Sequence, residues 1–370
     1  MPELAEWLKM LLAFAASLLI AYVMTPPVKT FAEKVGAMDV PKDERRVHDH
    51  PIPRMGGLAI FLGFVVSVLI FVPMSTEVMG MLIGAVIIVV MGAVDDIVSL
   101  NPWVKLAVQV FAAWVAIRSG LVFNYISTLN IFSPETAVNV GFLAVPFTML
   151  WIVGCTNAVN LIDGLDGLAV GVSAISSLTM FVVSLFVAEP AVSVILIALT
   201  GACLGFIPYN RNPAQNFMGD VGSQLLGFVL SAASIMGMFK FHAIIAFLVP
   251  VLALAVPLAD TVFAFFRRIA RGQSPFHADK GHFHHRLLAL GLNQKQAVAV
   301  LYGFSAVLGL LAVLLAGDSI LLKVICIILA FGISLAMWLI VLRKVTPNAE
   351  KDQSKEIGKK NKGHDPKDEV

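Results

Sequence analysis

Long apolar segments recur along this chain and limit what it can fold into. A helix needs about 20 apolar residues to cross the roughly 30 Å hydrocarbon core of a bilayer. We predict eleven such spans, at 4–24, 55–73, 78–94, 102–120, 138–155, 167–187, 191–208, 221–239, 241–265, 297–316 and 319–342. Hydrophobic residues make up 58% of the chain and charged residues 14%, which excludes an ordinary water-soluble domain. The sequence therefore predicts an all-α, polytopic integral membrane protein.

The distribution of basic residues predicts the orientation of these spans. If the N-terminus lies outside, the inside segments are 25–54, 95–105, 155–166, 209–220, 266–296 and the tail from 343. These segments hold 22 of the 26 Lys and Arg residues, and cytoplasmic loops are where basic residues collect. We therefore expect a cytoplasmic C-terminus and polar loops gathered on the cytoplasmic face. Residues 1–344 are expected to form one transmembrane catalytic domain, and residues 345–370 a disordered, charged cytoplasmic tail.

Two further features exclude other classes. The net charge of +2 reflects membrane topology rather than a basic stripe, so membrane lipids are expected partners and nucleic acid is not. Cys155, Cys203 and Cys326 are odd in number and form no C-x-x-C pair. Neither a disulfide framework nor a cysteine-based zinc site is expected.

Carboxylates stand at the inner ends of several spans. Asp95 and Asp96 end the third span, Asp163 and Asp166 lie in the segment NAVNLIDGLDGLA at 157–169, and Asp220 lies in FMGDVGS at 217–223. Ionisable groups near a span cost free energy, so a set of them requires a reason beyond the proximity of helix ends to the headgroups. Clustered oxygen ligands suit Mg²⁺ or Mn²⁺ better than zinc or copper. Since Mg²⁺ is commonly held by a few carboxylates together with phosphates, the pattern indicates a phosphate-bearing substrate.

The segment 157–169 also predicts a local structure. Asn157, Asn160, Asp163 and Asp166 recur every three residues, which keeps neighbours on adjoining helix surface. Gly164 and Gly167 are poor helix residues and allow close approach of the backbone to a ligand. We expect the helix to end near Asn160 and the DGLDG sequence to form a pocket wall. The alternative is a turn that merely joins two spans.

A basic loop at 267–287 is rich in arginine and histidine. Its members are Arg267, Arg268, Arg271, His277, His282, His284, His285 and Arg286. Zinc is an alternative explanation for close histidines, but H-x-H-H lacks the i, i+4 spacing of a helical zinc site. Guanidinium groups beside imidazoles favour an anion site that binds phosphate oxygens.

Five ordered motifs carry a resemblance to a known family. They are RRVHDHPIPRMGG at 45–57, GAVDDIVSLNPWVKL at 92–106, NAVNLIDGLDGLA, PYNRNPAQNFMGDVGS at 208–223, and the H-x-H-H loop. With these the chain resembles the polyprenyl-phosphate N-acetylhexosamine-1-phosphate transferase family. The resemblance implies ten or eleven transmembrane helices and dependence on Mg²⁺, with Mn²⁺ as an alternative. It also implies transfer of a sugar 1-phosphate from a UDP-sugar to undecaprenyl phosphate with release of UMP, at the inner face of a bacterial cytoplasmic membrane.

Within this family the basic loop is similar to that of the branch that uses UDP-N-acetylglucosamine. The muramoyl-pentapeptide branch usually shows four histidines and a Glu at this place, whereas here Phe283 interrupts the run and Arg286 follows it. The resemblance therefore implies UDP-N-acetylglucosamine as the donor. A muramoyl-pentapeptide phosphotransferase of the same family is the alternative.

The resemblance also implies roles for particular residues. The catalytic residues would be Asp95, Asp96, Asp163 and Asp220, and the metal ligands Asp220 with Asp95, Asp96 or Asn160. Lys105 and Asp95 would meet the acceptor phosphate, although a lysine at a span mouth also suits simple snorkelling. The nucleotide sugar would contact Asn157, Asn160, Asp163, Gly164, Leu165, Asp166, Asn210, Phe217, Arg268, Arg271, His282, His284 and His285.

Two other classes of protein remain as alternatives. A secondary transporter would carry its polar residues near the midplane of broken helices, whereas here they gather on one face. A membrane metallohydrolase would explain histidines together with aspartates, and the metal that restores activity after chelation separates it from a transferase. The sequence leaves open whether the protein forms a homodimer.

Overall fold

The computed structural model describes residues 3–40, 50–123, 125–127, 137–139, 141–187, 190–238, 243–270, 282–316 and 319–342. The tail at 345–370, and Arg271 and His277 of the basic loop, lie outside the described residues. Predictions made for them are therefore not addressed by the structure.

The described residues form thirteen α-helices and two short hairpins. The helices are α1 Leu4–Val35, α2 Gly57–Phe71, α3 Thr76–Val98, α4 Pro102–Arg118, α5 Ala144–Leu161, α6 Leu168–Val187, α7 Pro190–Asn210, α8 Gly219–Met238, α9 Ala243–Ala253, α10 Ala255–Ala270, α11 Phe283–Ala289, α12 Gln294–Leu315 and α13 Ile320–Leu342. Strand β1 Met38–Asp39 pairs antiparallel with β2 Ile52–Pro53, and β3 Tyr125–Ser127 pairs antiparallel with β4 Ala137–Asn139. A 3-10 turn, η1 Gly141–Leu143, precedes α5.

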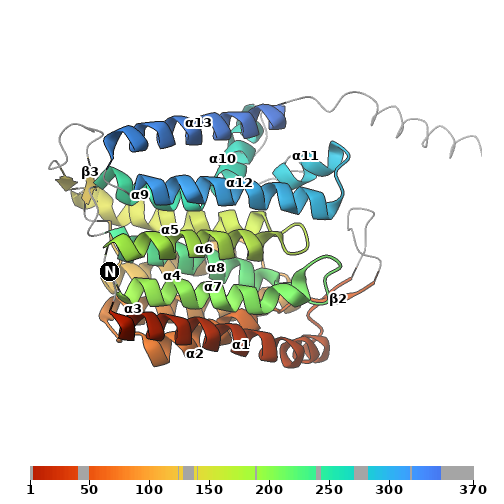
Figure 1. The fold of residues 1–370 in the computed structure, drawn as a ribbon. Coiled ribbons are helices and arrows are strands. Elements are labelled where there is room, and N and C mark those ends of the chain that lie inside the picture. The colour runs from red at the N-terminus through yellow and green to blue at the C-terminus, as the bar shows by residue number, and fades with distance from the viewer. Residues whose placement is uncertain are drawn as a thin grey trace, which may run out of the picture.

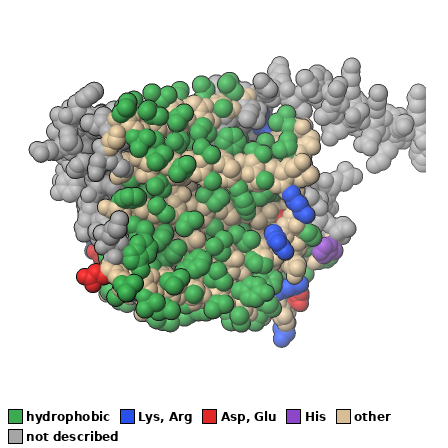
Figure 2. All heavy atoms as spheres, in the orientation of Figure 1, with side chains coloured by type: hydrophobic (Ala, Val, Ile, Leu, Met, Phe, Trp, Pro, Cys, Tyr) green, Lys and Arg blue, Asp and Glu red, His purple; other side chains and the backbone are tan. Residues whose placement is uncertain are grey.

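The prediction of an all-α, multi-span chain is confirmed. Among the described residues, seven helices are long and apolar enough to cross a bilayer by length and composition. Most helices lie alongside one another as a bundle, with β2 and α11 at one end and β3 at the other (Figure 1). Figure 2 shows hydrophobic side chains over most of the visible face of this bundle, and the Lys and Arg side chains visible on that face gather at the end of β2 and α11.

Helix α8 forms the centre of the bundle and packs against α3, α5, α2 and α6. Glycines allow α2 and α3 to approach the backbone of the first turns of α8 closely. A Cβ added at Gly57 of α2 would lie 2.1 Å from the backbone nitrogen of Gly222, and one at Gly92 of α3 would lie 2.6 Å from Cα of Val221. Small residues at such contacts allow transmembrane helices to pack backbone against backbone. The N-terminus of α8 is thereby fixed beside the ends of α2 and α3.

The structure corrects the predicted single span at 241–265. This segment forms two helices, α9 and α10, with a break at Leu254. Pro257 explains the break, because it has no N–H to donate to the carbonyl of Ala253. The hydroxyl of Ser176 on α6 donates to that carbonyl instead.

Two predicted boundaries were also wrong. Helix α1 continues to Val35, eleven residues past the predicted end of the first span at residue 24. Helix α5 begins at Ala144 rather than 138, because residues 137–139 pair with β3. The predicted end of this helix near Asn160 is confirmed, since α5 ends at Leu161.

Candidate functional site

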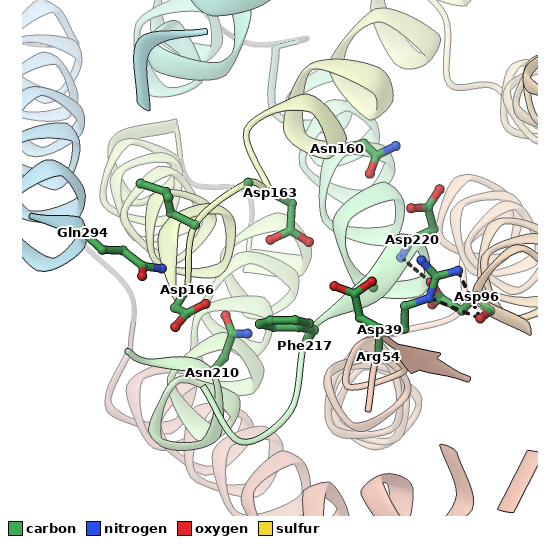
Figure 3. A pocket seen from close by; sticks show the side chains of 13 residues that line it. Asp39, Arg54, Asp96, Asn160, Asp163, Asp166, Asn210, Phe217, Asp220 and Gln294 are labelled. Carbon is green, nitrogen blue, oxygen red and sulfur yellow. Dashed lines mark hydrogen bonds and ion pairs between the residues drawn. The ribbon is translucent and has the colours of Figure 1, made fainter. Parts of the chain in front are cut away.

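A cavity of about 260 Å³ brings together residues from five separate parts of the chain (Figure 3). It is lined by Asp39, Arg54, Asp96, Asn160, Asp163, Gly164, Leu165, Asp166, Asn210, Phe217, Gly219, Asp220 and Gln294. These residues come from the first polar loop, the end of α3, the α5–α6 turn, the α7–α8 connection and the start of α12. Eight of the positions expected to form the site therefore surround one space with Asp96: Asn160, Asp163, Gly164, Leu165, Asp166, Asn210, Phe217 and Asp220.

Backbone hydrogen bonds join the first polar loop to the segment before α8. The N–H of Phe217 donates to the carbonyl of Pro53 at 2.8 Å. In return Gly56 N–H donates to the carbonyl of Phe217, and Gly57 N–H to that of Met218, both at 2.9 Å. This pairing places Arg54 beside the start of α8. It explains why two loops more than 150 residues apart line the same cavity.

Asp96 caps the N-terminus of α8 from a different helix. Its Oδ1 accepts from the backbone N–H of Asp220 at 3.1 Å, and its Oδ2 accepts from that of Val221 at 3.3 Å. Arg54 Nε lies 3.6 Å from Oδ1 of this carboxylate, which is 2% exposed. Gly219 permits the approach: its φ is +72°, and a Cβ there would lie 2.3 Å from Asp96 Oδ2. A carboxylate at a helix N-terminus is favoured by the unpaired N–H groups and the helix dipole.

Lys105 lies between the other two acids of the cluster. Its Nζ donates to Asp95 Oδ2 at 2.7 Å and to Asp220 Oδ2 at 2.8 Å. Asp95 Oδ1 accepts from the backbone N–H of Leu100 at 2.7 Å. Lys105 thus offsets the repulsion between two carboxylates that come from α3 and α8.

The three acids have the composition and spacing of a cation site. Asp95, Asp96 and Asp220 can each offer one carboxylate oxygen, and these oxygens lie within 4.8 Å of one another. Lys105 and Arg54 offset two of the three negative charges, which leaves one uncompensated. Hard oxygen donors with residual negative charge suit a hard divalent cation. Both oxygens of Asp96 and of Asp95 already accept hydrogen bonds, whereas the side-chain donors Lys105 and Gln224 both reach Oδ2 of Asp220. Asp220, which also lines the cavity, is therefore the best placed ligand.

A chain of buried amides leads to Asp220 from inside the bundle. Asn157 Nδ2 donates to Gln109 Oε1 at 2.7 Å, and Gln109 Nε2 donates to Gln224 Oε1 at 2.8 Å. Gln224 Nε2 then donates to Asp220 Oδ2 at 2.8 Å. The chain joins α5, α4 and α8, and each amide satisfies the next. Asn157 was expected to contact substrate, but it is held in this series of amide hydrogen bonds and is not part of the cavity lining.

The DGLDG segment forms one wall of the cavity. Asn160 Oδ1 accepts from Ser223 Oγ at 2.7 Å, and Asp166 Oδ2 accepts from Asn212 Nδ2 at 2.8 Å. Burial, with repulsion from Asp220 and Asp166, raises the pKa of Asp163 to about 7. Asp163 therefore holds a proton at neutral pH far more readily than an exposed aspartate does. The alternative of a simple connecting turn does not explain why both aspartates of this segment line a cavity together with three further acids.

Asn210 and Phe217 lie at the cavity in different ways. Asn210 is 2% exposed, and its amide accepts from Gly167 N–H at 3.1 Å and donates to the carbonyl of Asn216 at 3.0 Å. It therefore braces two loops as well as lining the cavity. Figure 3 shows the ring of Phe217 at the cavity wall, between Asn210 and Asp39.

The histidines lie behind the cavity wall. Among the described residues, none of His282, His284 and His285 lines the cavity. His282 Nδ1 lies 3.0 Å from Asp260 Oδ2, and a Cβ added at Gly164 would lie 2.4 Å from His284 Nε2. Burial and the neighbouring His285 lower the pKa of His284 to about 4, so its ring is neutral. Arg268 lies on α10 and is likewise not in the lining, so its contact with substrate stays a prediction.

Sequence reasoning missed several residues of this region. Asp260 is an acid inside a predicted span, which is itself a signal of function. Gln224 lies one helical turn after Asp220, a spacing at which side chains meet. Asp39 and Gln294 carry no local signal, because only the tertiary fold places them at the cavity.

Comparisons with known proteins agree on one family. Residues 78–238 match glycosyl transferase family 4. The chain is 39% identical over 321 residues to a probable undecaprenyl-phosphate N-acetylglucosaminyl 1-phosphate transferase of Bacillus subtilis, covering 86% of this chain and 88% of that protein. It is 36% identical to a decaprenyl-phosphate N-acetylglucosaminephosphotransferase of Mycobacterium tuberculosis, covering 77% of each. A phospho-N-acetylmuramoyl-pentapeptide-transferase of Staphylococcus aureus is 32% identical, with 70% of this chain and 83% of that protein covered.

Proposed function

The chain belongs to glycosyl transferase family 4, and from this premise we propose that it transfers N-acetylglucosamine 1-phosphate from UDP-N-acetylglucosamine to undecaprenyl phosphate. UMP is the second product, and the lipid-linked sugar starts the synthesis of a cell-envelope glycan. The relative from Bacillus subtilis carries this activity in its name, and its similarity extends over most of both chains.

One observation carries the proposal: a cluster of three carboxylates adjoins a cavity that also contains an aromatic ring and polar loop groups. Asp220 and Phe217 are three residues apart and both line this cavity. Uracil would stack on Phe217 and satisfy its imide and carbonyls with Asp166 and nearby backbone groups. The pyrophosphate would then lie toward Asp220, where positive charge can be concentrated.

We propose that Asp220 and Asp95 hold a Mg²⁺ ion, with Asp96 and Asn160 nearby, and that Mn²⁺ can replace it. When bound, the ion neutralises charge that develops on the phosphoryl oxygens. The oxygen-only donor set supports this choice over zinc.

Lys105 and Asp95 would position the acceptor. Lys105 Nζ lies within hydrogen-bond distance of both Asp95 and Asp220, so a phosphate entering there would meet a cation between two acids. A phosphate monoester has a second pKa near 6 and is mostly dianionic at pH 7. A general base therefore contributes little, and holding the two anions in line contributes most.

The site is proposed to face the cytoplasm of a bacterial cell membrane. The acceptor carries a long isoprenoid and arrives within the bilayer, whereas the nucleotide sugar is water-soluble, so a site at the interface serves both. The basic residues at the cavity end of the bundle support the cytoplasmic side (Figure 2).

The test is an assay with the full chain in lipid nanodiscs, undecaprenyl phosphate and a radiolabelled nucleotide sugar. We expect label in the lipid product and stoichiometric UMP with UDP-N-acetylglucosamine, restored by Mg²⁺ after chelation. Transfer only from the UDP-muramoyl-pentapeptide would favour the alternative within the family. Restoration by zinc alone, or release of free sugar phosphate without lipid product, would refute the proposal in favour of a hydrolase.

A further inference from the structure

A buried carboxylate lies outside the cavity and is not used by the proposed reaction. Asp260 on α10 is 2% exposed, and both of its oxygens are engaged. Oδ1 accepts from the backbone N–H of Phe283 at 2.9 Å, and Oδ2 lies 3.0 Å from Nδ1 of His282. Burying a carboxylate and an imidazole costs free energy that an apolar pair would not incur. The pair therefore requires a reason other than stability.

The two contacts of Asp260 tie down the start of α11. His282 is the residue that precedes this helix, and its own side chain makes no capping hydrogen bond. Asp260 lies on α10 and supplies the missing acceptor to the first N–H group of α11, that of Phe283. The rings of Phe263 and Phe283 meet edge to face at 5.8 Å beside it and strengthen the α10–α11 contact.

From α11 the contact continues to the cavity wall. His284 follows Phe283, is 3% exposed, and stacks parallel to His282 with ring centroids 5.9 Å apart. Its Nε2 lies against Gly164, so closely that a Cβ at that glycine would approach to 2.4 Å. Gly164 lies between Asp163 and Asp166, both of which line the cavity. A displacement of α11 would therefore displace these two acids.

We propose that Asp260 is a positioning residue that, through His282 and Phe283, holds α11 against Gly164 and so sets the position of the DGLDG wall. The inference rests on the proposed function only for the identity of the molecule that the wall binds. The link between Asp260 and the wall is a property of the fold and can be measured without turnover.

The experiment is hydrogen exchange of the full chain in nanodiscs, with Asp260→Asn. An asparagine keeps the shape but offers one acceptor and one donor group, so it cannot accept from both partners. We expect faster exchange in peptides covering 162–168 and 283–289, with α8 peptides unchanged. Thr261→Val is the matched control, because the Thr261 hydroxyl donates only within α10, to the carbonyl of Pro257. Equal exchange in the two variants, or faster exchange throughout the chain, would overturn the proposal.

A second variant probes the same link from the other end. Gly164→Ala leaves Asp260 intact and inserts a methyl group against His284. It should speed exchange in 283–289, and unchanged exchange there would refute the link even if Asp260→Asn does not fold.

Turnover supplies an independent measurement. In Asp260→Asn the KM for the nucleotide sugar should rise ~10-fold, because the wall that binds it is displaced, while kcat changes less. A large fall in kcat with little change in KM would contradict a role in positioning this wall. If the unmodified chain transfers no sugar phosphate, the proposed function fails, and the exchange measurements still decide the role of Asp260.

Discussion

Lys105 and Asp220 lie 115 positions apart in the sequence, and the Lys105 ammonium donates to Asp220 Oδ2 at 2.8 Å. The same oxygen accepts from Gln224, and the same ammonium donates to Asp95. The charge at this site is therefore shared among α3, α4 and α8. Single substitutions can therefore change the net charge of this site.

Removing the ammonium group of Lys105, which lies between Asp95 and Asp220, should change metal binding and turnover in opposite directions. In Lys105→Met the carboxylates lose their counter-charge, so the site should bind a divalent cation more tightly. Transfer should nevertheless fall ~100-fold, because the acceptor phosphate loses a positively charged donor. Calorimetric titration with Mn²⁺ and the label-transfer assay measure the two effects. Lys295→Met, at an exposed lysine of α12, is the control. Weaker cation binding in Lys105→Met would contradict this account.

The buried amide chain should stabilise the fold as well as orient Asp220. Gln224→Leu removes the donor to Asp220 and leaves the Gln109 amide with only its longer bond, to Asn157 Oδ1 at 3.4 Å. We expect a loss of about 1–3 kcal/mol in the free energy of unfolding, because buried polar groups become unpaired. Denaturant unfolding in detergent measures it. Ser231→Ala on the same helix loses only a hydrogen bond within its own helical turn, so it should lower the free energy of unfolding less. A similar loss in both variants would argue against a stabilising role for the amide chain.

Gly219 should tolerate no side chain. Its φ of +72° and its contact with Asp96 mean that Gly219→Ala introduces both backbone strain and a clash at the capped end of α8. We expect a lower melting temperature and loss of transfer. Gly303→Ala is the matched control, since no heavy atom lies within 4 Å of a Cβ added there. Equal melting temperatures for the two variants would show that α8 can begin differently.

The raised pKa of Asp163 predicts a pH dependence of stability. In the folded state this pKa is about 7, against 3.8 for the unperturbed group, so the unfolded chain releases the proton first as pH rises. Asp163 therefore lowers stability progressively between about pH 4 and 7, and the full cost remains above pH 7. Asp163→Asn removes this cost, so its melting temperature should exceed that of the unmodified chain more at pH 8 than at pH 5. A difference that is independent of pH would show that Asp163 ionises normally.

The spans themselves could be predicted because the constraint on them is local. A segment in hydrocarbon must satisfy its own backbone hydrogen bonds, so its length and polarity decide that it is a helix. The order of the polar motifs and the one-sided basic residues likewise indicated that the acids would gather at one end. The predicted helix boundaries were less accurate where contacts with other segments determine where a helix begins or ends, as at β4 and at the α9–α10 break.

What the sequence alone determined is the class of the protein: a helical membrane chain with a set of acids at the ends of its spans and five motifs of one transferase family. The tertiary structure decided the role of each polar residue. It made Asp96 a cap for α8, placed Asn157 in an amide chain, and put His284 behind Gly164 rather than in the cavity. The physical reason is that a hydrogen bond depends on distances of about 3 Å between atoms, and residues on different helices reach such distances only after the bundle has packed.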